Sequence, residues 1–317
     1  MTAARFKRAI RRAREDFREA MAGTLAIDTA QFEAPGLLRG WLGALKPSTR
    51  ELVLEDHDGD EEKWFASMFE ENGIGYRLPG APPLLVVNTD EPYIFEDSAR
   101  STEYTAAHEV GHHVTDNGIP SYQLQESPIP PSEQIIAEQD HLAELAADGF
   151  AVPYALKNRA LKKPDFKRIA DVNAVEVWMT TDITHLTFPV IDELVVNAAR
   201  VDYAALSPAG AADLADACAE RHRRDADEIA VAWAALKLTF MGEDPERMLR
   251  TGARQPYFEN LADVFRTADR ESLEGRVAAR VLRLALDNGA LPLMYGGSLP
   301  VRTDTKFWRS LRPELAR

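Results

Sequence analysis

The sequence predicts an α+β fold in which helices surround a small β-sheet and the C-terminal part is mostly helical. Three observations favour this fold. Only two short segments, residues 74–78 and 84–87, have the composition of strands. Elsewhere, apolar residues recur mainly at helical spacing. The chain has 317 residues, of which 45% are hydrophobic and 28% charged, so it holds enough apolar material for a substantial core.

The N-terminal third is predicted to combine helices with these two strands. Residues 1–22 place apolar side chains at helical spacing among many basic ones, which indicates a helix docked on the body of the protein. A helix lying on a membrane surface is the alternative. Residues 23–50 show a mixed pattern, and residues 60–72 indicate a short helix capped at Asn72-Gly73. Pro79-Gly80 is expected to form a turn after the first strand.

Two further helices are predicted in the middle of the chain. The first covers about residues 98–117, and Gly118 is expected to end it. The second begins at Ser132, a good N-cap residue, and runs to about Ala151. The residues between them, 119–131, contain four prolines and are expected to form a loop.

The C-terminal part is predicted to consist of long helices. Residues 208–241 and 257–288 have this pattern, and Asn288-Gly289 is expected to end the second. Ser207-Pro208 is a clear helix start and the best domain boundary. We therefore predict a first domain over residues 1–206, with its core at about 74–155, and a helical region over residues 207–317 that serves as a sensor or docks a partner.

Charge and composition exclude several classes of protein. The formal net charge is −14, from 37 Lys and Arg against 51 Asp and Glu, which disfavours a broad nucleic-acid surface. The single cysteine, Cys218, rules out an intramolecular disulfide and fits a reducing compartment. No stretch approaches the roughly 20 apolar residues that span a bilayer, and no apolar run follows the basic N-terminus as in a signal peptide. We expect a cytoplasmic protein without a membrane span or a nucleic-acid partner.

The most informative segment is residues 108–112, which read H-E-V-G-H and form an H-E-x-x-H motif within a predicted helix. Residues i and i+4 lie on one helix face, so His108 and His112 can bind one cation. Glu109 lies beside them and can contact a water bound to that cation. Zinc is the usual ion, because it accepts neutral imidazole and carboxylate and keeps an open position in catalytic sites. Two surface histidines beside an accidental glutamate are the alternative.

A catalytic zinc site needs a third protein ligand, and the sequence narrows the choice. The extended motif with a third histidine would need glycine at position 115 and histidine at position 118, where the chain has Thr115 and Gly118. Cys218 has no supporting motif. Glu144 and Asp148 are again i and i+4 on the following helix, so one carboxylate can bind the metal and the other can accept the spare ring N–H of a ligand histidine. Two acids on a solvated helix face are the alternative.

Residues about 74–152 resemble the ImmA/IrrE family of zinc metallopeptidases. A strand ending in LVVN (85–88) precedes the motif helix. The helix segment RSTEYTAAHEVGHH (100–113) is similar to the family's Arg, Thr, Ala, His-Glu-x-Gly-His pattern, and ELAADGFA (144–151) is close to its Glu-x-x-Ala-Asn/Asp-x-Phe-Ala pattern. The resemblance implies a zincin-like core in which His108, His112 and Glu144 bind Zn²⁺. It also implies that Glu109 is the catalytic acid/base and that Asp148 supports a ligand histidine.

The resemblance further implies a function. We expect a zinc-dependent metalloendopeptidase that cleaves a protein or peptide substrate, through limited proteolysis of a regulatory protein such as a transcriptional repressor. In this reading Glu109 takes a proton from the attacking water and passes it to the leaving amine. By analogy with zincins, the strand Leu84–Asn88 is expected to pair with extended substrate.

Other polar residues near the motif were assigned lesser roles. His141, Tyr104 and Tyr154 are candidates for contacting the oxyanion or the substrate. A solvated surface position is favoured for His141, and ordinary packing is favoured for the two tyrosines. His185 and His222 have no evident partner in the sequence. Cys218 is expected to be a small buried side chain.

Two alternative functions remain open on the sequence. In the first, the protein binds zinc without catalysis, and the metal stabilises a regulatory or interaction module. In the second, the chain binds no metal and is an acidic, helical interaction protein. The enzyme is favoured because a purely structural zinc site has no need for Glu109.

Overall fold

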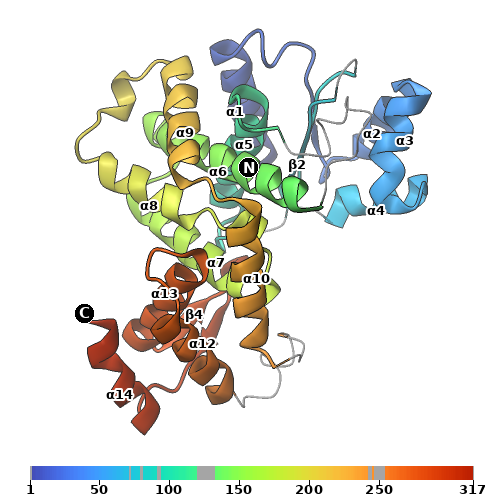
Figure 1. Ribbon diagram of the computed structural model, residues 1–317. Coiled ribbons are helices and arrows are strands. Elements are labelled where there is room, and N and C mark those ends of the chain that lie inside the picture. Colours follow the sequence, from blue (N-terminus) through green and yellow to red (C-terminus); the bar gives the residue numbers. More distant parts are fainter. Residues whose placement is uncertain are drawn as a thin grey trace.

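The computed structural model describes residues 2–70, 73–78, 81–90, 94–119, 133–241, 245 and 254–316. Within them helices predominate over two small sheets, so the α+β prediction is confirmed (Figure 1). The predicted turn Pro79-Gly80, the N-cap Ser132, Asn72 of the predicted C-cap and all of the predicted loop except Ile119 lie outside these residues. No helix in the described ranges combines the length and the apolar character needed to cross a membrane.

The elements of the N-terminal half are α1 (Thr2–Asp16), β1 (Leu25–Asp28), α2 (Ala34–Ala44), α3 (Pro47–Leu54), α4 (Glu61–Glu70), β2 (Gly73–Tyr76), β3 (Leu84–Val87), α5 (Ser98–Val114) and α6 (Glu133–Lys157). The later elements are α7 (Lys163–Thr180), α8 (Phe188–Asn197), α9 (Pro208–His222), α10 (Ala226–Leu238), α12 (Gln255–Thr267), α13 (Leu273–Asn288), β4 (Ala290–Pro292), β5 (Ser298–Pro300) and α14 (Lys306–Leu315). Short 3₁₀ turns cover Glu55–His57, Ile183–His185, Tyr203–Ala205 and Met294–Gly296.

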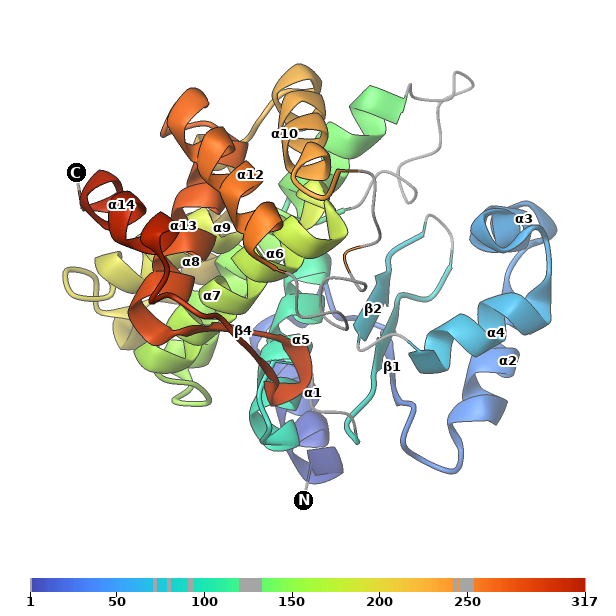
Figure 2. The same cartoon turned by 90° about the horizontal axis from the view of Figure 1, so that it is seen from below.

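The three-stranded sheet has the order β1-β3-β2, with β1 parallel and β2 antiparallel to β3. All four residues of β3 are buried, and the alternation of side chains along a strand assigns them to two separate cores. Leu85 and Val87 pack with α1, α5 and α6, whereas Leu84 and Val86 pack with the helices α2–α4. The sheet therefore lies between two helical layers (Figure 2).

The sheet topology corrects the predicted substrate strand. β3 is bonded on both sides, to β1 and to β2, so Leu84–Asn88 has no free edge for an added strand. β2 lies at the edge of the sheet, next to α5. The pairing of β1 with β3 joins segments about sixty residues apart, and the mixed pattern of residues 23–50 does not predict it.

Several predicted helix ends also differ from the structure. α1 ends at Asp16 rather than at residue 22, although turns continue the chain and the N–H groups of Phe17 and Met21 bond to the carbonyls of Ala13 and Phe17. α5 ends at Val114, because Thr115 is extended; Gly118 is not its cap. α6 continues past Ala151 and Pro153 to Lys157, since the side chains around the proline are buried in the core.

The predicted long C-terminal helices are each divided in two. α9 ends at His222, and Asp225 caps α10 by accepting from the N–H of Glu228. Ser272 likewise caps α13, which ends at the left-handed Gly289 as predicted. Ser207 caps α9, and α9 packs along α6. The domain boundary at this point stays a prediction.

Candidate metal centre

The site is built where α5 crosses α6. A Cβ atom on Gly111 of α5 would lie 2.7 Å from the Cα of Ala147 on α6, so only glycine permits this approach of the two helices. Ala147 lies between Glu144 and Asp148 in the sequence, so the crossing brings both carboxylates to the histidine face of α5. The glycine of the motif therefore positions the second half of the site.

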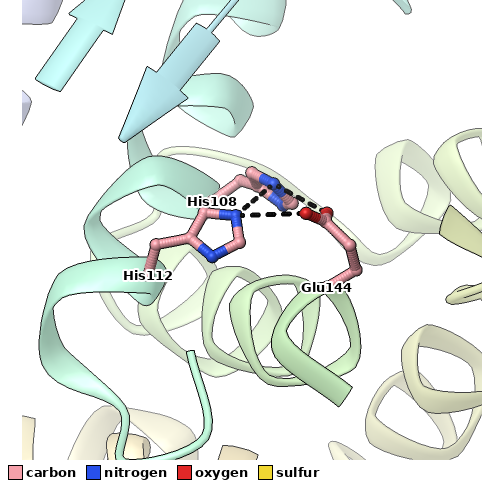
Figure 3. Close-up of side chains that lie close together, drawn as sticks. All are labelled: His108, His112 and Glu144. Atoms are coloured by element: carbon pink, nitrogen blue, oxygen red, sulfur yellow. Dashed lines mark hydrogen bonds and ion pairs between the residues drawn. The ribbon is translucent and has the colours of Figure 1, made fainter. Parts of the chain in front are cut away.

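Three side chains with ligand-type atoms converge at this crossing (Figure 3). The Nε2 atoms of His108 and His112 lie 3.2 Å apart. The Oε2 atom of Glu144 is 3.3 Å from His108 Nε2, and its Oε1 atom is 3.5 Å from His112 Nε2. Ligands about 2.0–2.1 Å from a tetrahedral ion are separated by roughly 3.3 Å. The distances from the two imidazole nitrogens to each other and to the Glu144 carboxylate are close to this value, so the three side chains can surround one zinc ion.

The second ring nitrogen of each histidine fixes its tautomer. His112 Nδ1 is 2.8 Å from the carbonyl oxygen of Gly118, which can only accept, so this nitrogen carries the proton. His108 Nδ1 is 2.8 Å from Asp148 Oδ1, a carboxylate oxygen that also accepts. Both Nε2 lone pairs then face each other and Glu144. Three acceptors that face one another need a positive charge between them, which either a metal ion or a proton on His108 would supply.

The charges around the site favour a cation as well. Burial lowers the pKa of His108, but Asp148 and Glu144 outweigh it and raise that pKa well above its usual value. Burial raises the pKa of Glu144, but the imidazoles of His185, His112 and His108 outweigh it and lower that pKa. Glu144 therefore stays ionised at neutral pH and is available as an anionic ligand.

Asp148 is held in a network that leaves it little freedom. Its side chain is 3% exposed and accepts from the hydroxyls of Tyr104 and Thr187 as well as from His108. Tyr104 lines the cleft, but its hydroxyl is bonded to Asp148, so it supports the carboxylate that orients His108. Such contacts behind a ligand histidine set both its tautomer and its ring orientation.

Glu109 lies beside the metal centre and is not one of the three converging residues. Its side chain is 4% exposed and packs against the edge strand β2. A Cβ atom on Gly73 would lie 2.5 Å from its Oε1, and one on Gly75 would lie 3.1 Å from its Oε2. The two glycines of β2 therefore leave the space that this carboxylate occupies.

Comparison with known proteins does not place the chain in a family. No family model, curated protein or solved structure matches it. The resemblance to the ImmA/IrrE peptidases therefore stays a prediction, based on the motif residues.

Two cavities meet at the metal centre. One, of about 360 Å³, extends along α7, and the other, of about 350 Å³, extends along β2. Residues of the centre line both of them, namely His108, Glu109 and Glu144, together with Gly73 and His185. An extended chain can therefore pass on both sides of the candidate metal position.

His185 is the cleft residue that sequence reasoning missed. Its Nδ1 is 2.8 Å from Asp182 Oδ2, and its Nε2 is 3.8 Å from Glu144 Oε2. Asn173 on α7 holds this turn by donating to the His185 carbonyl and accepting from the N–H groups of Thr187 and Phe188. The spacing Asp182-x-x-His185 is a local signal for the pair, but nothing in the sequence places it against Glu144.

The other predicted contact residues lie away from the cleft. The hydroxyl of Tyr154 donates to Asp16 Oδ2 at 3.0 Å, near α1 rather than at the metal centre. His141 is 1% exposed, which contradicts the solvated position favoured for it. Its Nδ1 lies 3.1 Å from the carbonyl of Thr184 and donates to it. His141 thus fixes the turn that carries His185.

A second group of ligand-type residues consists of Glu193, Cys218 and His222. Cys218 is buried, as predicted. Here Glu193 Oε2 is only 2.8 Å from His222 Nε2, shorter than the edge of a zinc tetrahedron, and Arg221 already pairs with the same carboxylate. The group therefore fits a metal less well than the centre at the α5–α6 crossing.

Proposed function

We propose that this chain is a zinc-dependent metallopeptidase that cleaves a peptide bond in a protein or peptide substrate. The observation that carries the proposal is the convergence of His108, His112 and Glu144 in a cleft. Glu109 lines the same cleft but is not one of these three candidate ligands. Two neutral imidazoles and one carboxylate form a ligand set of catalytic zinc sites that leaves one position open. Limited proteolysis of a regulatory protein, such as a transcriptional repressor, is the specific role that we infer from the family resemblance.

A zinc ion held by these residues would lower the pKa of a coordinated water and polarise the scissile carbonyl. The chain supplies the proton transfers. Glu109 lines both cavities, and its carboxylate is placed to take a proton from the attacking water and to return it to the leaving amine. The glycines of β2 leave the space that this carboxylate occupies.

His185 is suited to stabilise the negative oxygen that forms on the substrate. Its Nδ1 is held by Asp182, so its Nε2 faces the cleft near Glu144. Glu144 and Asp182 outweigh burial and raise the pKa of His185 to about 9. The raised pKa favours the charged form of the imidazole, in which Nε2 is a hydrogen-bond donor. A positioned donor of this kind stabilises the tetrahedral transition state of acyl transfer.

The edge strand β2 provides a surface for the substrate backbone. The cavity beside it is lined by Gly73, Ile74, Gly75 and Tyr76 together with the metal-centre residues. A peptide in this cavity would lie beside the metal-centre residues that line it. The cavity beside β2, rather than an edge of β3, is therefore the proposed place of the substrate.

The first experiment is metal analysis followed by a search for cleavage. Protein purified without chelator is expected to contain about one zinc per chain, and Glu144→Ala is expected to lose most of it. Glu138→Ala is the matched control, because Glu138 lies on the same helix and pairs with Arg223. Glu109→Gln is expected to keep the zinc and to lose cleavage of a proteome-derived peptide mixture. Zinc binding without cleavage by the wild type would favour the non-catalytic alternative, and the absence of zinc would overturn the proposal.

A further inference from the structure

One wall of the larger cavity is a single face of α7. Its members recur at helical spacing and consist of Ile169, Val172, Asn173, Glu176, Val177 and Thr180. Ile169, Val172 and Val177 make this wall apolar, and all three are buried. Glu176 places a carboxyl group on the same wall. The α7 wall thus combines an apolar surface with one acidic group that is not a candidate metal ligand.

The charge of this cavity is strongly one-sided. Its described lining contains six carboxyl groups, those of Glu70, Glu109, Glu144, Asp148, Glu176 and Asp182, and no lysine or arginine. Four of these groups already have roles in the proposed site. Glu144 is a metal ligand and Glu109 the catalytic base, while Asp148 supports His108 and Asp182 supports His185. Glu70 is exposed at the end of α4. Of the six carboxyl groups, Glu176 is therefore the half-buried one that has no role so far.

Glu176 differs from the other acids in its contacts. In the part of the chain that the structure describes, no hydrogen bond or ion pair reaches its carboxylate. Burial and the nearby Asp182 raise its pKa, against an opposing effect of His185. A carboxylate that is partly desolvated without a partner costs free energy, and a cation that enters the cavity would recover it.

We propose that the cleft selects substrates with a lysine or arginine side chain next to the scissile bond, and that Glu176 is the residue that determines this specificity. The inference rests on the proposed peptidase function. The methylene stem of such a side chain packs along Val172 and Val177, and its ammonium or guanidinium group pairs with Glu176. An acidic side chain at this position would be repelled by the carboxyl group of Glu176 and would find no lysine or arginine in the described lining.

The test uses two peptides that differ only in one central residue, Lys or Glu, next to the same scissile bond. Their sequence is taken from a cleavage site found in the proteome-derived mixture or, if none is found, from an alanine-rich peptide. Zinc-loaded Glu109→Gln protein is titrated with each fluorescently labelled peptide, and wild-type protein is assayed for kcat/KM. We expect at least a tenfold preference for the Lys peptide in both measurements. Glu176→Gln is expected to remove most of it, and Glu176→Lys to reverse it.

Glu259→Gln is the matched control, because it removes the same charge from α12 and lines neither cavity. It is expected to keep the preference. Cleavage or binding without a Lys preference, or a preference that Glu176→Gln leaves intact, would overturn the inference while the peptidase function stands. Selective binding of the Lys peptide without any cleavage would instead contradict the peptidase function and leave the cation-binding role of Glu176 supported.

Discussion

Gly111 and Ala147 lie in direct contact where α5 crosses α6, and a side chain on Gly111 would collide with the Ala147 backbone. This contact sets the distance between the two histidines of α5 and Glu144 of α6. The geometry of the metal centre therefore depends on a residue that does not bind the metal.

Gly111→Ala is expected to weaken zinc binding at least tenfold. The added methyl group would lie 2.7 Å from the Ala147 Cα and would push the helices apart, with a packing cost of about 1–3 kcal/mol. Gly40→Ala is the control, since nothing lies within 4 Å of the added atom in α2 and the change should stabilise that helix by about 0.5–1 kcal/mol. Zinc titration and thermal unfolding of both variants test this, and unchanged zinc affinity in Gly111→Ala would contradict it.

Asp148→Asn is expected to lower zinc affinity about 10–100-fold without removing a ligand. Asp148 accepts from three donors, and an amide replaces one of its acceptor oxygens with a further donor. The Nδ1–H of His108 then loses its negatively charged acceptor. Competition titrations with a zinc-binding dye measure the change. Asp182→Asn is the comparison, and we expect it to leave zinc affinity within about twofold, since Asp182 contacts His185 rather than a predicted ligand.

The sequence predicts those parts of the site that depend on local periodicity. His108 and His112, like Glu144 and Asp148, are one helical turn apart, so their shared faces follow from the helix alone. Periodicity shows which residues share a face, but it does not show what covers that face. For this reason the burial of His141 was not predicted, and the contact of His185 with Glu144, which joins two elements, could not be found.

The same distinction explains the errors in the fold. The apolar run of β3 indicates a buried strand, but its two neighbours depend on long-range pairing, so the free edge was assigned to the wrong strand. Gly118 was interpreted as a helix cap, whereas its carbonyl accepts from His112 six residues away. The break between α9 and α10 has a local signal, the capping box formed by Asp225 and Glu228, but apolar spacing alone does not reveal it.

His185→Gln is expected to reduce kcat roughly 100-fold while leaving the zinc content unchanged. Because the pKa of His185 is raised to about 9, the charged form is present at neutral pH and is lost as the pH rises through that value. A bound cation shares the charge of Glu144, so we expect the alkaline limb of the kcat profile at or below pH 9. The variant should lack this limb. A profile that keeps the limb in His185→Gln would exclude His185 as its source.

His141 should make the stability of the protein sensitive to acid. Burial lowers the pKa of His141 from 6.5 to about 4, and its Nε2 makes no hydrogen bond within the described residues. Above pH 6.5 the imidazole is neutral in both the folded and the unfolded chain. Below it the unfolded chain binds the proton first, so the free energy of unfolding should fall by about 3 kcal/mol between pH 6.5 and pH 4.

His141→Asn separates this effect from acid release of a metal. The asparagine amide can still donate to the Thr184 carbonyl, as His141 Nδ1 does at 3.1 Å, but it does not titrate in this range. Urea unfolding with chelator present, at several pH values between 7 and 4, gives the slope of the free energy of unfolding against pH for both proteins. We expect a shallower slope for the variant below pH 6.5. Equal slopes would mean that His141 takes up its proton equally in the folded and unfolded chains.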